Sequence, residues 1–435
     1  MRVELVMPRV IDEEFRLLPL NLAMLASLTP SEIEISIVDE AVERINFDEQ
    51  VDLVGISCTT TVVPRVYEIA AEYRKRGVKV VLGGTHPTLM PHEAIKHGDS
   101  VCIGEAEGSW GEMLADFKRG KLKRFYRSDG YCSLKGLPTP RRDLFDTKHY
   151  LPIDGMQTSR GCPFACDFCV VTTVFGHKYR LRPIKDVLAE IDTLKHKYLF
   201  FYDDNIVGNP KHSKELFRAL IPYNKRWIGQ APTTVIKDPE LLKLMAKSGC
   251  KGLLVGFESL SEQNLRRSLK RHNNPRQYKE VVRKLHDLGI TISGAFIFGL
   301  DDDDSSVFER TLEFAMDVEL DIAQFNWLTP YPGTPIYDRL KAENRLINTQ
   351  WWSTGSGVGT ETGEAVVYHP KMMSADELKE GSRWVRSNFY STSSILRRFF
   401  GRDRLSLSRL SLFDLLLYGK VNWGYRRQYA RDWRG

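Results

Sequence analysis

The chain has 435 residues, of which 42% are hydrophobic and 27% charged, and its formal net charge is +6. This composition is that of an ordinary globular protein, and it excludes collagen-like, intrinsically disordered and disulfide-dense chains. No apolar stretch approaches the ~20 residues that a membrane-spanning helix needs, and acidic residues come too early for a secretory signal. The cytoplasm is therefore the expected compartment, and the length predicts about three domains.

Strands and helices alternate over residues 1–125. Strands are expected at 3–8, 33–40, 51–57, 78–84 and 101–107, with helices at 19–28 and 65–76 between them. The strand VKVVLGG is apolar nearly throughout, as in a parallel strand that is covered on both faces. This order predicts a doubly wound, Rossmann-like α/β domain, followed by a linker rich in Gly, Pro and charge at 126–155.

The alternation resumes at Met156 and predicts a second domain over residues 156–345. Strands are expected at 156–161, 197–204, 226–231, 252–259, 291–300 and 323–331, and helices include 185–194, 239–247 and 278–288. Six such units predict a partial (β/α)6 barrel instead of a complete eight-unit barrel. Residues 346–435 lack this rhythm and are expected to form a small, mainly helical region that is aromatic and basic.

Three of the seven cysteines form a C-x3-C-x2-C cluster, namely Cys162, Cys166 and Cys169. They follow the first barrel strand, at the end of a barrel where active sites are built. Thiolates at this spacing can converge on one metal centre, but tetrahedral zinc needs four protein ligands and no fourth cysteine lies nearby. Three thiolates fit a four-iron cluster that leaves one iron open to an external ligand. Zinc and a set of cysteines without metal are the alternatives.

This motif, with the aromatic Phe168 directly before the last cysteine, resembles that of the radical S-adenosylmethionine (radical SAM) superfamily. The resemblance implies a 4Fe-4S cluster whose open iron chelates the amino and carboxylate groups of S-adenosylmethionine (SAM). An electron from the cluster then cleaves SAM to methionine and a 5′-deoxyadenosyl radical. An external donor such as flavodoxin or ferredoxin would supply the electron, and the protein would be sensitive to oxygen.

The resemblance extends along the second domain and implies further contacts with SAM. Besides Phe168, the implied contacts are Asp203, Asp204, Glu258, Ser259, Gly294 and Phe296. The two Asp end the second strand, where the family holds the methionine amino end. Glu258 and Ser259 end the fourth strand, where a carboxylate commonly accepts the ribose hydroxyls, and the last two lie on the fifth strand, beside the adenine. Helix capping, a turn and core packing are the structural alternatives, and the acidic run 301–304 is expected to be a solvated loop.

The N-terminal domain carries a second resemblance. The segments VGIS, LGGTH and GEAE are similar to those of the cobalamin-binding domain that precedes one large radical SAM branch. The resemblance implies that the nucleotide tail of cobalamin inserts beside the sheet, where absent side chains make room. The implied contacts are Ser57, Thr59, Gly83, Gly84 and His86.

A cobalt-ligating histidine is not expected in this domain. The family's D-x-H-x-x-G motif is absent from the segment Pro8 to Glu14 after the first strand. His86, His92 and His97 are expected to be structural or on the surface instead of binding cobalt. Cobalamin bound without a histidine ligand fits this branch, and a domain that kept the fold but lost the cofactor is the alternative.

The positive charge is concentrated in the C-terminal tail. From residue 381 onward there are twelve Arg and Lys against three Asp, so the rest of the chain is slightly acidic. An apolar stripe predicts an amphipathic helix with Leu405, Leu407, Leu410, Phe413, Leu416 and Leu417 on one face. A docked helical lid, contact with an anionic membrane surface, and binding of an acidic substrate or nucleic acid all stay open. No RNA-binding module is recognisable, so nucleic acid is not an expected partner.

Together the two resemblances imply a cobalamin-dependent radical SAM methyltransferase that acts on an unactivated carbon of a lipid, tetrapyrrole or specialised metabolite. The branch includes class B methyltransferases and the anaerobic magnesium-protoporphyrin ester cyclase. One alternative is therefore a non-methylating enzyme that closes a ring or rearranges a carbon skeleton. Another is a SAM- and cobalamin-binding sensor without turnover. The sequence does not identify catalytic side chains beyond the cofactor ligands.

Overall fold

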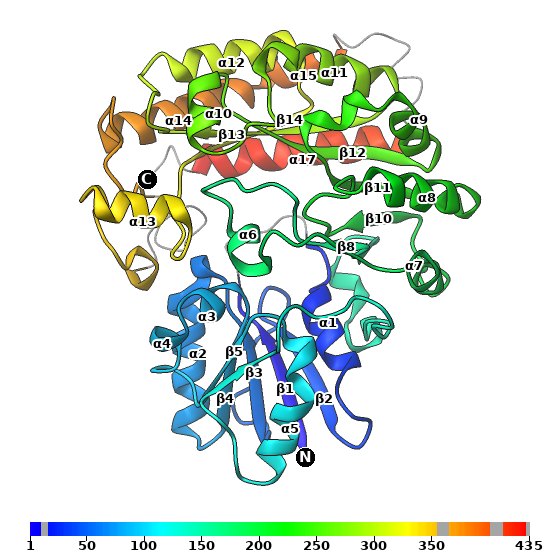
Figure 1. Cartoon of the computed structure of the whole chain (residues 1–435), viewed down its shortest axis with the longest axis vertical. Coiled ribbons are helices and arrows are strands. Elements are labelled where there is room, and N and C mark those ends of the chain that lie inside the picture. Colours follow the sequence, from blue (N-terminus) through cyan, green and yellow to red (C-terminus); the bar gives the residue numbers. More distant parts are fainter. Residues whose placement is uncertain (10–15, 355–364, 401–411, 432–435) are drawn as a thin grey trace.

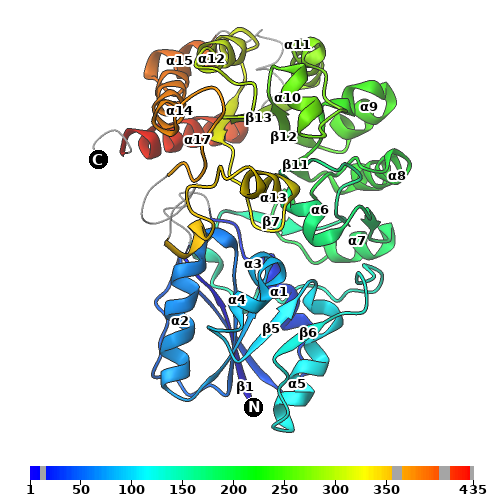
Figure 2. The same ribbon diagram turned by 60° about the vertical axis from the view of Figure 1, so that its left-hand side comes forward.

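The computed structural model describes residues 1–9, 16–354, 365–400 and 412–431, which form two lobes (Figure 1). The lower lobe contains the N-terminal sheet, and the upper lobe contains a second sheet together with the C-terminal helices. Figure 2 shows the same arrangement from another direction. Helix α6 (Val170–Phe175), which follows the last cysteine of the motif, lies where the lobes meet.

The N-terminal sheet has six parallel strands in the order β2-β1-β3-β4-β5-β6. The strands are β1 (Arg2–Met7), β2 (Glu34–Asp39), β3 (Leu53–Ser57), β4 (Lys79–Gly83), β5 (Ser100–Ile103) and β6 (Phe125–Arg127). The helices are α1 (Leu20–Ser27), α2 (Val63–Lys75), α3 (Thr85–Leu89), α4 (Pro91–Ala94) and α5 (Trp110–Lys118). The five expected strands and the doubly wound fold are confirmed. Strand β6 was not predicted, and Tyr126 fixes it by donating a 2.9 Å hydrogen bond from its hydroxyl to Asp116 Oδ2 of α5.

The second sheet also has six parallel strands, in the order β14-β13-β12-β11-β10-β7, which confirms the partial barrel. Its strands are β7 (Ile153–Met156), β10 (Tyr198–Phe201), β11 (Arg226–Gln230), β12 (Cys250–Glu258), β13 (Thr291–Phe298) and β14 (Ile322–Trp327). The first strand was predicted three residues too late, because β7 lies in the Gly- and Pro-rich segment expected to be a linker. Within the predicted range, β8 (Ser159–Arg160) instead pairs antiparallel with β9 (Arg180–Leu181).

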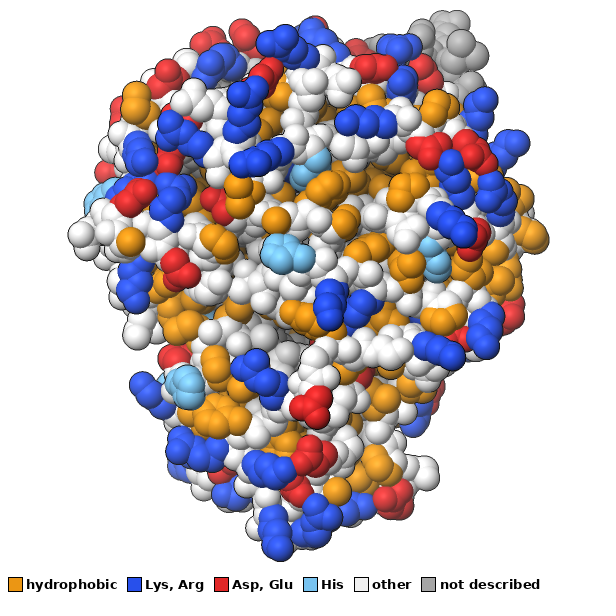
Figure 3. All heavy atoms as spheres, viewed as in Figure 1, with side chains coloured by type: hydrophobic (Ala, Val, Ile, Leu, Met, Phe, Trp, Pro, Cys, Tyr) orange, Lys and Arg blue, Asp and Glu red, His pale blue; other side chains and the backbone are white. Residues whose placement is uncertain are grey.

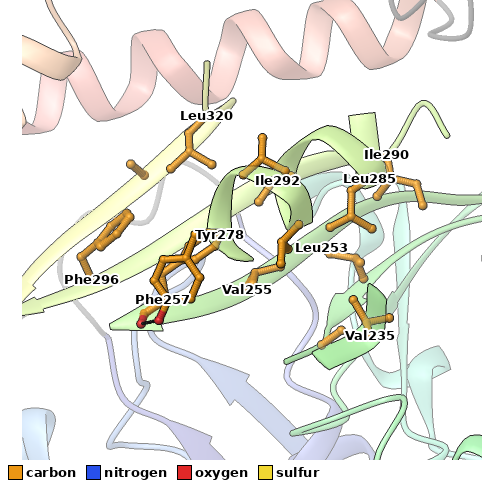
Figure 4. Close-up of a cluster of buried hydrophobic side chains, with 14 of the residues drawn as sticks. Val235, Leu253, Val255, Phe257, Tyr278, Leu285, Ile290, Ile292, Phe296 and Leu320 are labelled. Atoms are coloured by element: carbon orange, nitrogen blue, oxygen red, sulfur yellow. Dashed lines mark hydrogen bonds between the residues drawn. The ribbon is translucent and has the colours of Figure 1, made fainter. Parts of the chain in front are cut away.

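Helices cover the outer face of this sheet and form the main hydrophobic core with it (Figures 1 and 4). They are α7 (Ile184–Ile191), α8 (Pro210–Leu220), α9 (Pro239–Lys247), α10 (Glu262–Arg267), α11 (Tyr278–Asp287), α12 (Val307–Asp317) and α13 (Pro335–Ala342). Figure 4 shows Phe257 of β12 and Phe296 of β13 beside Tyr278 of α11. Successive residues of β13 alternate between this core and the barrel interior.

The described C-terminal residues form helices α14 (Ala375–Phe389), α15 (Thr392–Phe400) and α17 (Leu412–Arg431). The Tyr390 hydroxyl donates to the carbonyl oxygen of Ala323 at 2.8 Å, which attaches this region to strand β14. Asn422 of α17 donates through Nδ2 to the carbonyl oxygen of Asp321 at 3.2 Å. Helix α17 is therefore docked on the barrel.

The predicted apolar stripe of the tail falls outside the described residues at Leu405, Leu407 and Leu410, and the side chains of Phe413, Leu416 and Leu417 are not described either. Of the helices that the structure describes, none combines the length and the apolar character that crossing a membrane requires. On the face shown in Figure 3, Lys and Arg are spread over both lobes and interleaved with Asp and Glu.

Candidate active site and cofactor sites

Two aspartates at the end of β10 hold the segment that leads into the cysteine motif. Asp203 is fully buried and accepts hydrogen bonds from the Thr158 amide at 3.0 Å, the Thr158 hydroxyl at 2.7 Å and the Ser159 hydroxyl. Asp204 Oδ2 accepts from the amide of Gly161, the residue before Cys162, at 2.9 Å. The Asp203 carboxylate is therefore saturated by its own chain. Its geometry supports a positioning role beneath the cysteine loop instead of the expected contact with SAM.

The three thiol groups of the motif lie on one loop, close enough to influence one another. Burial raises the pKa of all three thiols, that of Cys166 to about 12, and the neighbouring thiols add to the effect at Cys166 and Cys169. Over the described part of the chain, no three His, Cys, Asp or Glu side chains already surround a common metal position. Assembly of a cluster must therefore draw these thiols together and release their protons. A donor set of three thiols fits a cluster with one open iron.

Lys270 places a buried positive charge beside this loop. Its ammonium group is bonded to Glu258 Oε1 and lies 5.9 Å from the centre of the Phe168 ring. Burial alone would lower the pKa of Lys270, but the ion pair with Glu258 outweighs burial and raises this pKa. Lys270 in turn opposes the rise of the thiol pKa values. The sequence analysis missed this residue.

Glu258 ends β12 in a conformation that few residues adopt. Its φ is +63°, in the left-handed region that costs a non-glycine residue free energy and is found most often at functional sites. A Cβ atom on Gly256 would come within 2.7 Å of Lys270 Nζ, so a glycine there makes room for the ion pair. The predicted Ser259 is buried, and its hydroxyl accepts from the Ser261 amide at 3.1 Å within the same turn.

Positions Gly294 and Phe296 of β13 face the hydrophobic core. A Cβ atom on Gly294 would meet Leu320 at 2.9 Å, and Phe296 stacks on Phe257 in the core (Figure 4). Ala295 and Ile297 occupy the opposite, half-buried positions of the strand. The family resemblance implies that backbone groups of this strand lie beside the adenine, and that stays a prediction.

A cavity of about 690 Å³ lies at the carboxyl ends of the N-terminal strands and extends toward the second lobe. The predicted Ser57, Thr59, Gly83 and Gly84 all line it. A Cβ atom on Gly83 would find no neighbour nearer than 3.7 Å, and one on the wall residue Gly104 would find none within 4 Å. Missing side chains thus widen the space beside the sheet, which fits the nucleotide tail of cobalamin.

His86 does not line this cavity, so its side chain does not support the predicted contact with cobalamin. The ring is fully buried, with Nε2 3.0 Å from Glu93 Oε2 and its centre 5.6 Å from that of the Trp352 ring. The segment Pro8 to Glu14 lacks the cobalt-ligating motif, and its residues from Val10 to Glu14 lie outside the described residues. Pro8, at the start of this segment, lines the cavity.

A buried ion-pair network joins the two lobes at the cysteine motif. Arg160 donates through Nη1 to Glu105 Oε1 at 2.5 Å and through Nη2 to Glu107 Oε1 at 2.7 Å. Arg180 Nη1 is 2.7 Å from Glu105 Oε2, which also accepts from the Cys132 amide at 2.8 Å. Both glutamates belong to the GEAE segment after β5, and Arg160 is two residues before Cys162. This network fixes the cysteine loop against the N-terminal lobe.

We expect Glu105→Gln to weaken the junction of the lobes. Breaking a buried ion pair costs about 3–5 kcal/mol, because the partner cations stay buried without compensation. The thermal midpoint of unfolding should fall by roughly 5 °C. Glu112→Gln is the control, since Glu112 pairs with Lys123 at the surface of the same lobe, where an ion pair contributes little. Equal midpoints for the two variants would contradict the role of the network.

Comparison with known proteins agrees with these sites. Residues 156–315 match the model of the radical SAM superfamily, and residues 14–113 match that of the B12 binding domain. The chain is 32% identical over 397 residues to bacteriochlorophyllide d C-12(1)-methyltransferase of Chlorobaculum tepidum, across 88% of this chain and 85% of that protein. It is 31% identical to the C-8(2)-methyltransferase of the same organism, across 76% of this chain and 77% of that one.

A solved structure shares the whole fold. It is the radical SAM methyltransferase TsrM from Kitasatospora setae with cobalamin and a 4Fe-4S cluster bound, with a TM-score of 0.72, 16% identity and coverage of 100% of both chains. The two lobes and their sites thus define an enzyme that combines a radical SAM barrel with a cobalamin-binding domain. The chain belongs to the family of cobalamin-binding radical SAM enzymes, and its cofactors are a 4Fe-4S cluster, SAM and cobalamin. Methyl transfer is favoured over ring closure and over a sensor without turnover.

Proposed function

We propose that the protein transfers a methyl group to an unactivated carbon on the periphery of a tetrapyrrole. The observation that carries this substrate class is the 32% identity across 85% of a bacteriochlorophyllide methyltransferase. The cavity adds physical support, because from the cobalamin site it extends along residues of the second lobe, including Gln157 and Tyr202. Much of its wall is apolar, including Leu20, Leu25, Leu137 and Phe175. A tetrapyrrole is flat, largely apolar and commonly carboxylated.

Aromatic rings and cations lie together beside this cavity. Phe175 lines it, and the guanidinium carbons of Arg160 and Arg180 lie 5.9 Å from the centre of this ring. Arg180 also lies 5.0 Å from the ring centre of Tyr131, which is 40% exposed. Aromatic rings in such a group favour stacking against a flat macrocycle.

Within the proposed reaction, the residues of this chain bind and position. Cys162, Cys166 and Cys169 would hold the cluster, and the cation of Lys270 would favour the carboxylate of SAM. When bound, the cluster with SAM supplies a carbon-centred radical, and cobalamin supplies the methyl group. The network of Arg160 with Glu105 would keep the two cofactor sites at a fixed separation. The proposed electron donor is an external protein such as flavodoxin or ferredoxin, and the proposed compartment is the cytoplasm. The basic C-terminal tail is proposed to contact a membrane surface.

Anaerobic turnover of the reconstituted enzyme with SAM, a reductant and bacteriochlorophyllide d tests the proposal. We expect a product heavier by one CH2 group, together with 5′-deoxyadenosine and S-adenosylhomocysteine in equal amounts. A product that has lost hydrogen without gaining carbon would favour ring closure instead. Turnover of SAM with a lipid but not with any tetrapyrrole would contradict the substrate class.

A further inference from the structure

A basic segment of the barrel lies against the cysteine loop. Residues 263–279 carry six Arg and Lys and no Asp or Glu. The backbone amide of Asp167, inside the cysteine motif, donates to the carbonyl oxygen of Ser268 at 3.2 Å. The ring of His272 stacks on that of Phe164 in the same motif, with 3.6 Å between the ring centres. Charges on this segment therefore lie beside the loop that carries the three thiols.

Four arginines of this segment are exposed, and neighbouring carboxylates neutralise them only in part. They are Arg266, Arg267, Arg271 and Arg276. Glu262 is shared by Arg266 and Arg276, at 3.4 Å and 3.0 Å, and Asp302 lies 3.2 Å from Arg267. Within the described part of the chain, no carboxylate forms an ion pair with Arg271. Four cations face two anions, so this surface keeps an excess of positive charge.

An exposed leucine stands among these arginines, at a turn where glycine is the usual residue. Leu269 follows the C-terminal cap of α10, its φ is +56°, and the next amide, of Lys270, donates back to the Leu265 carbonyl oxygen at 2.8 Å. Helices commonly end with glycine at this position, because a side chain is strained there. The Leu269 side chain is nevertheless 41% exposed. An apolar side chain that adds strain without entering the core, next to exposed arginines, is typical of a functional contact surface.

We propose that the basic patch, formed by these four arginines and Leu269, is the surface on which an acidic one-electron carrier protein docks. The inference rests on the external electron donor of the proposed function. Opposite charges steer such a carrier to the patch and fix its orientation there. The reduced carrier loses one electron, the oxidised cluster on the three cysteines gains it, and no proton passes between the two proteins. Contacts of the segment with Phe164 and Asp167 give this electron a short path to the cysteine loop.

The test compares Arg271→Glu with Arg218→Glu in the reconstituted full chain. Two acidic carriers, flavodoxin and ferredoxin, are used as probes, and dithionite serves as a small reductant that needs no docking. Binding of each oxidised carrier and the rate of cluster reduction by each reduced carrier are measured at low and high salt. With the carrier that serves the wild type, we expect Arg271→Glu to lower affinity and rate by about tenfold at low salt and by less at high salt. Reduction by dithionite should not change.

Arg218→Glu is the control, because it changes the net charge equally on a distant part of the same lobe. Arg218 is a half-exposed residue of α8, which lies to the right in the upper lobe of Figure 1, whereas α10 lies to the left. This control should bind and accept electrons like the wild type. Leu269→Gly is an independent variant that relieves the strained turn and removes the apolar contact. Its thermal midpoint of unfolding should not fall, while its affinity for the carrier should.

Wild-type affinity and reduction rate of Arg271→Glu with both carriers would overturn the docking surface. Failure of both carriers to reduce a wild-type cluster that dithionite reduces would overturn it too. An equally slow reduction of Arg271→Glu by dithionite would indicate damage to the cysteine loop instead. Loss of binding to anionic lipid vesicles, with both carriers unaffected, would assign the patch to a membrane and contradict the proposal. None of these measurements needs a tetrapyrrole or methyl transfer, so failure of the proposed substrate stays distinguishable from failure of the docking surface.

Discussion

Replacing Cys166 with alanine is expected to abolish iron incorporation and to reduce SAM cleavage to background. Cys166 is the buried member of the motif, and two thiolates cannot hold a cluster that needs three. Iron analysis, the visible absorption of the reconstituted protein and the yield of 5′-deoxyadenosine measure the effect. Cobalamin binding should persist, because the cavity beside the N-terminal sheet does not include Cys166.

Cys132→Ala is the matched control for this variant. Cys132 is a half-buried cysteine of the same region, and it contacts Glu105 through its backbone amide instead of its thiol. The Cys132→Ala variant should keep both its iron and its activity. Normal iron content in Cys166→Ala, or loss of iron in Cys132→Ala, would contradict the assignment of the cluster ligands.

Replacing Lys270 with methionine is expected to slow SAM cleavage by about a hundredfold, the usual effect of removing one positioned electrostatic contact. The variant removes the cation that influences all three thiols, and it leaves the Glu258 carboxylate buried without its partner. The single-turnover yield of 5′-deoxyadenosine and the reduction potential of the cluster measure the effect. The potential should become more negative, because a nearby positive charge stabilises the reduced cluster.

A loss of stability must be separated from this effect, since breaking a buried ion pair costs about 3–5 kcal/mol. The double variant Lys270→Met/Glu258→Gln leaves no buried charge without a partner. Its thermal midpoint of unfolding should therefore be higher than that of Lys270→Met and close to that of the wild type. Its SAM cleavage should stay low if the lysine charge itself matters. Lys270→Arg keeps the charge and should recover part of the activity. A double variant with wild-type cleavage would show that Lys270 serves the fold alone.

The sequence could predict a cofactor site where its residues stand close together along the chain. Three cysteines within one loop and small residues at the ends of β3 and β4 are local patterns, so sequence indicated both sites. Lys270 could not be found in this way, because it follows α10 and approaches Cys166 only through the fold of the barrel. The same holds for Glu105 and Arg160, although both stand in segments that the sequence analysis assigned to strands, 101–107 and 156–161.

The resemblance and the local sequence pattern differ in what they indicate about the strands. Gly294 and Phe296 were implied by the family resemblance through backbone groups of β13, and the alternating burial of this strand places both positions on its core face. Strand β7 was predicted three residues too late, because this edge strand, Ile153–Met156, lies in a segment whose Gly and Pro content predicts a loop. Neighbouring strand β10 supplies the pairing that overrides this local preference.

Cofactor analysis of the anaerobically reconstituted chain tests the central claim most directly. The protein is supplied with iron, sulfide and hydroxocobalamin, freed of unbound material and analysed for metal and corrinoid. The account predicts about four irons and one cobalamin per chain, with the iron lost in Cys166→Ala and the cobalamin retained. A chain that takes up no iron although its three cysteines are intact would contradict the account.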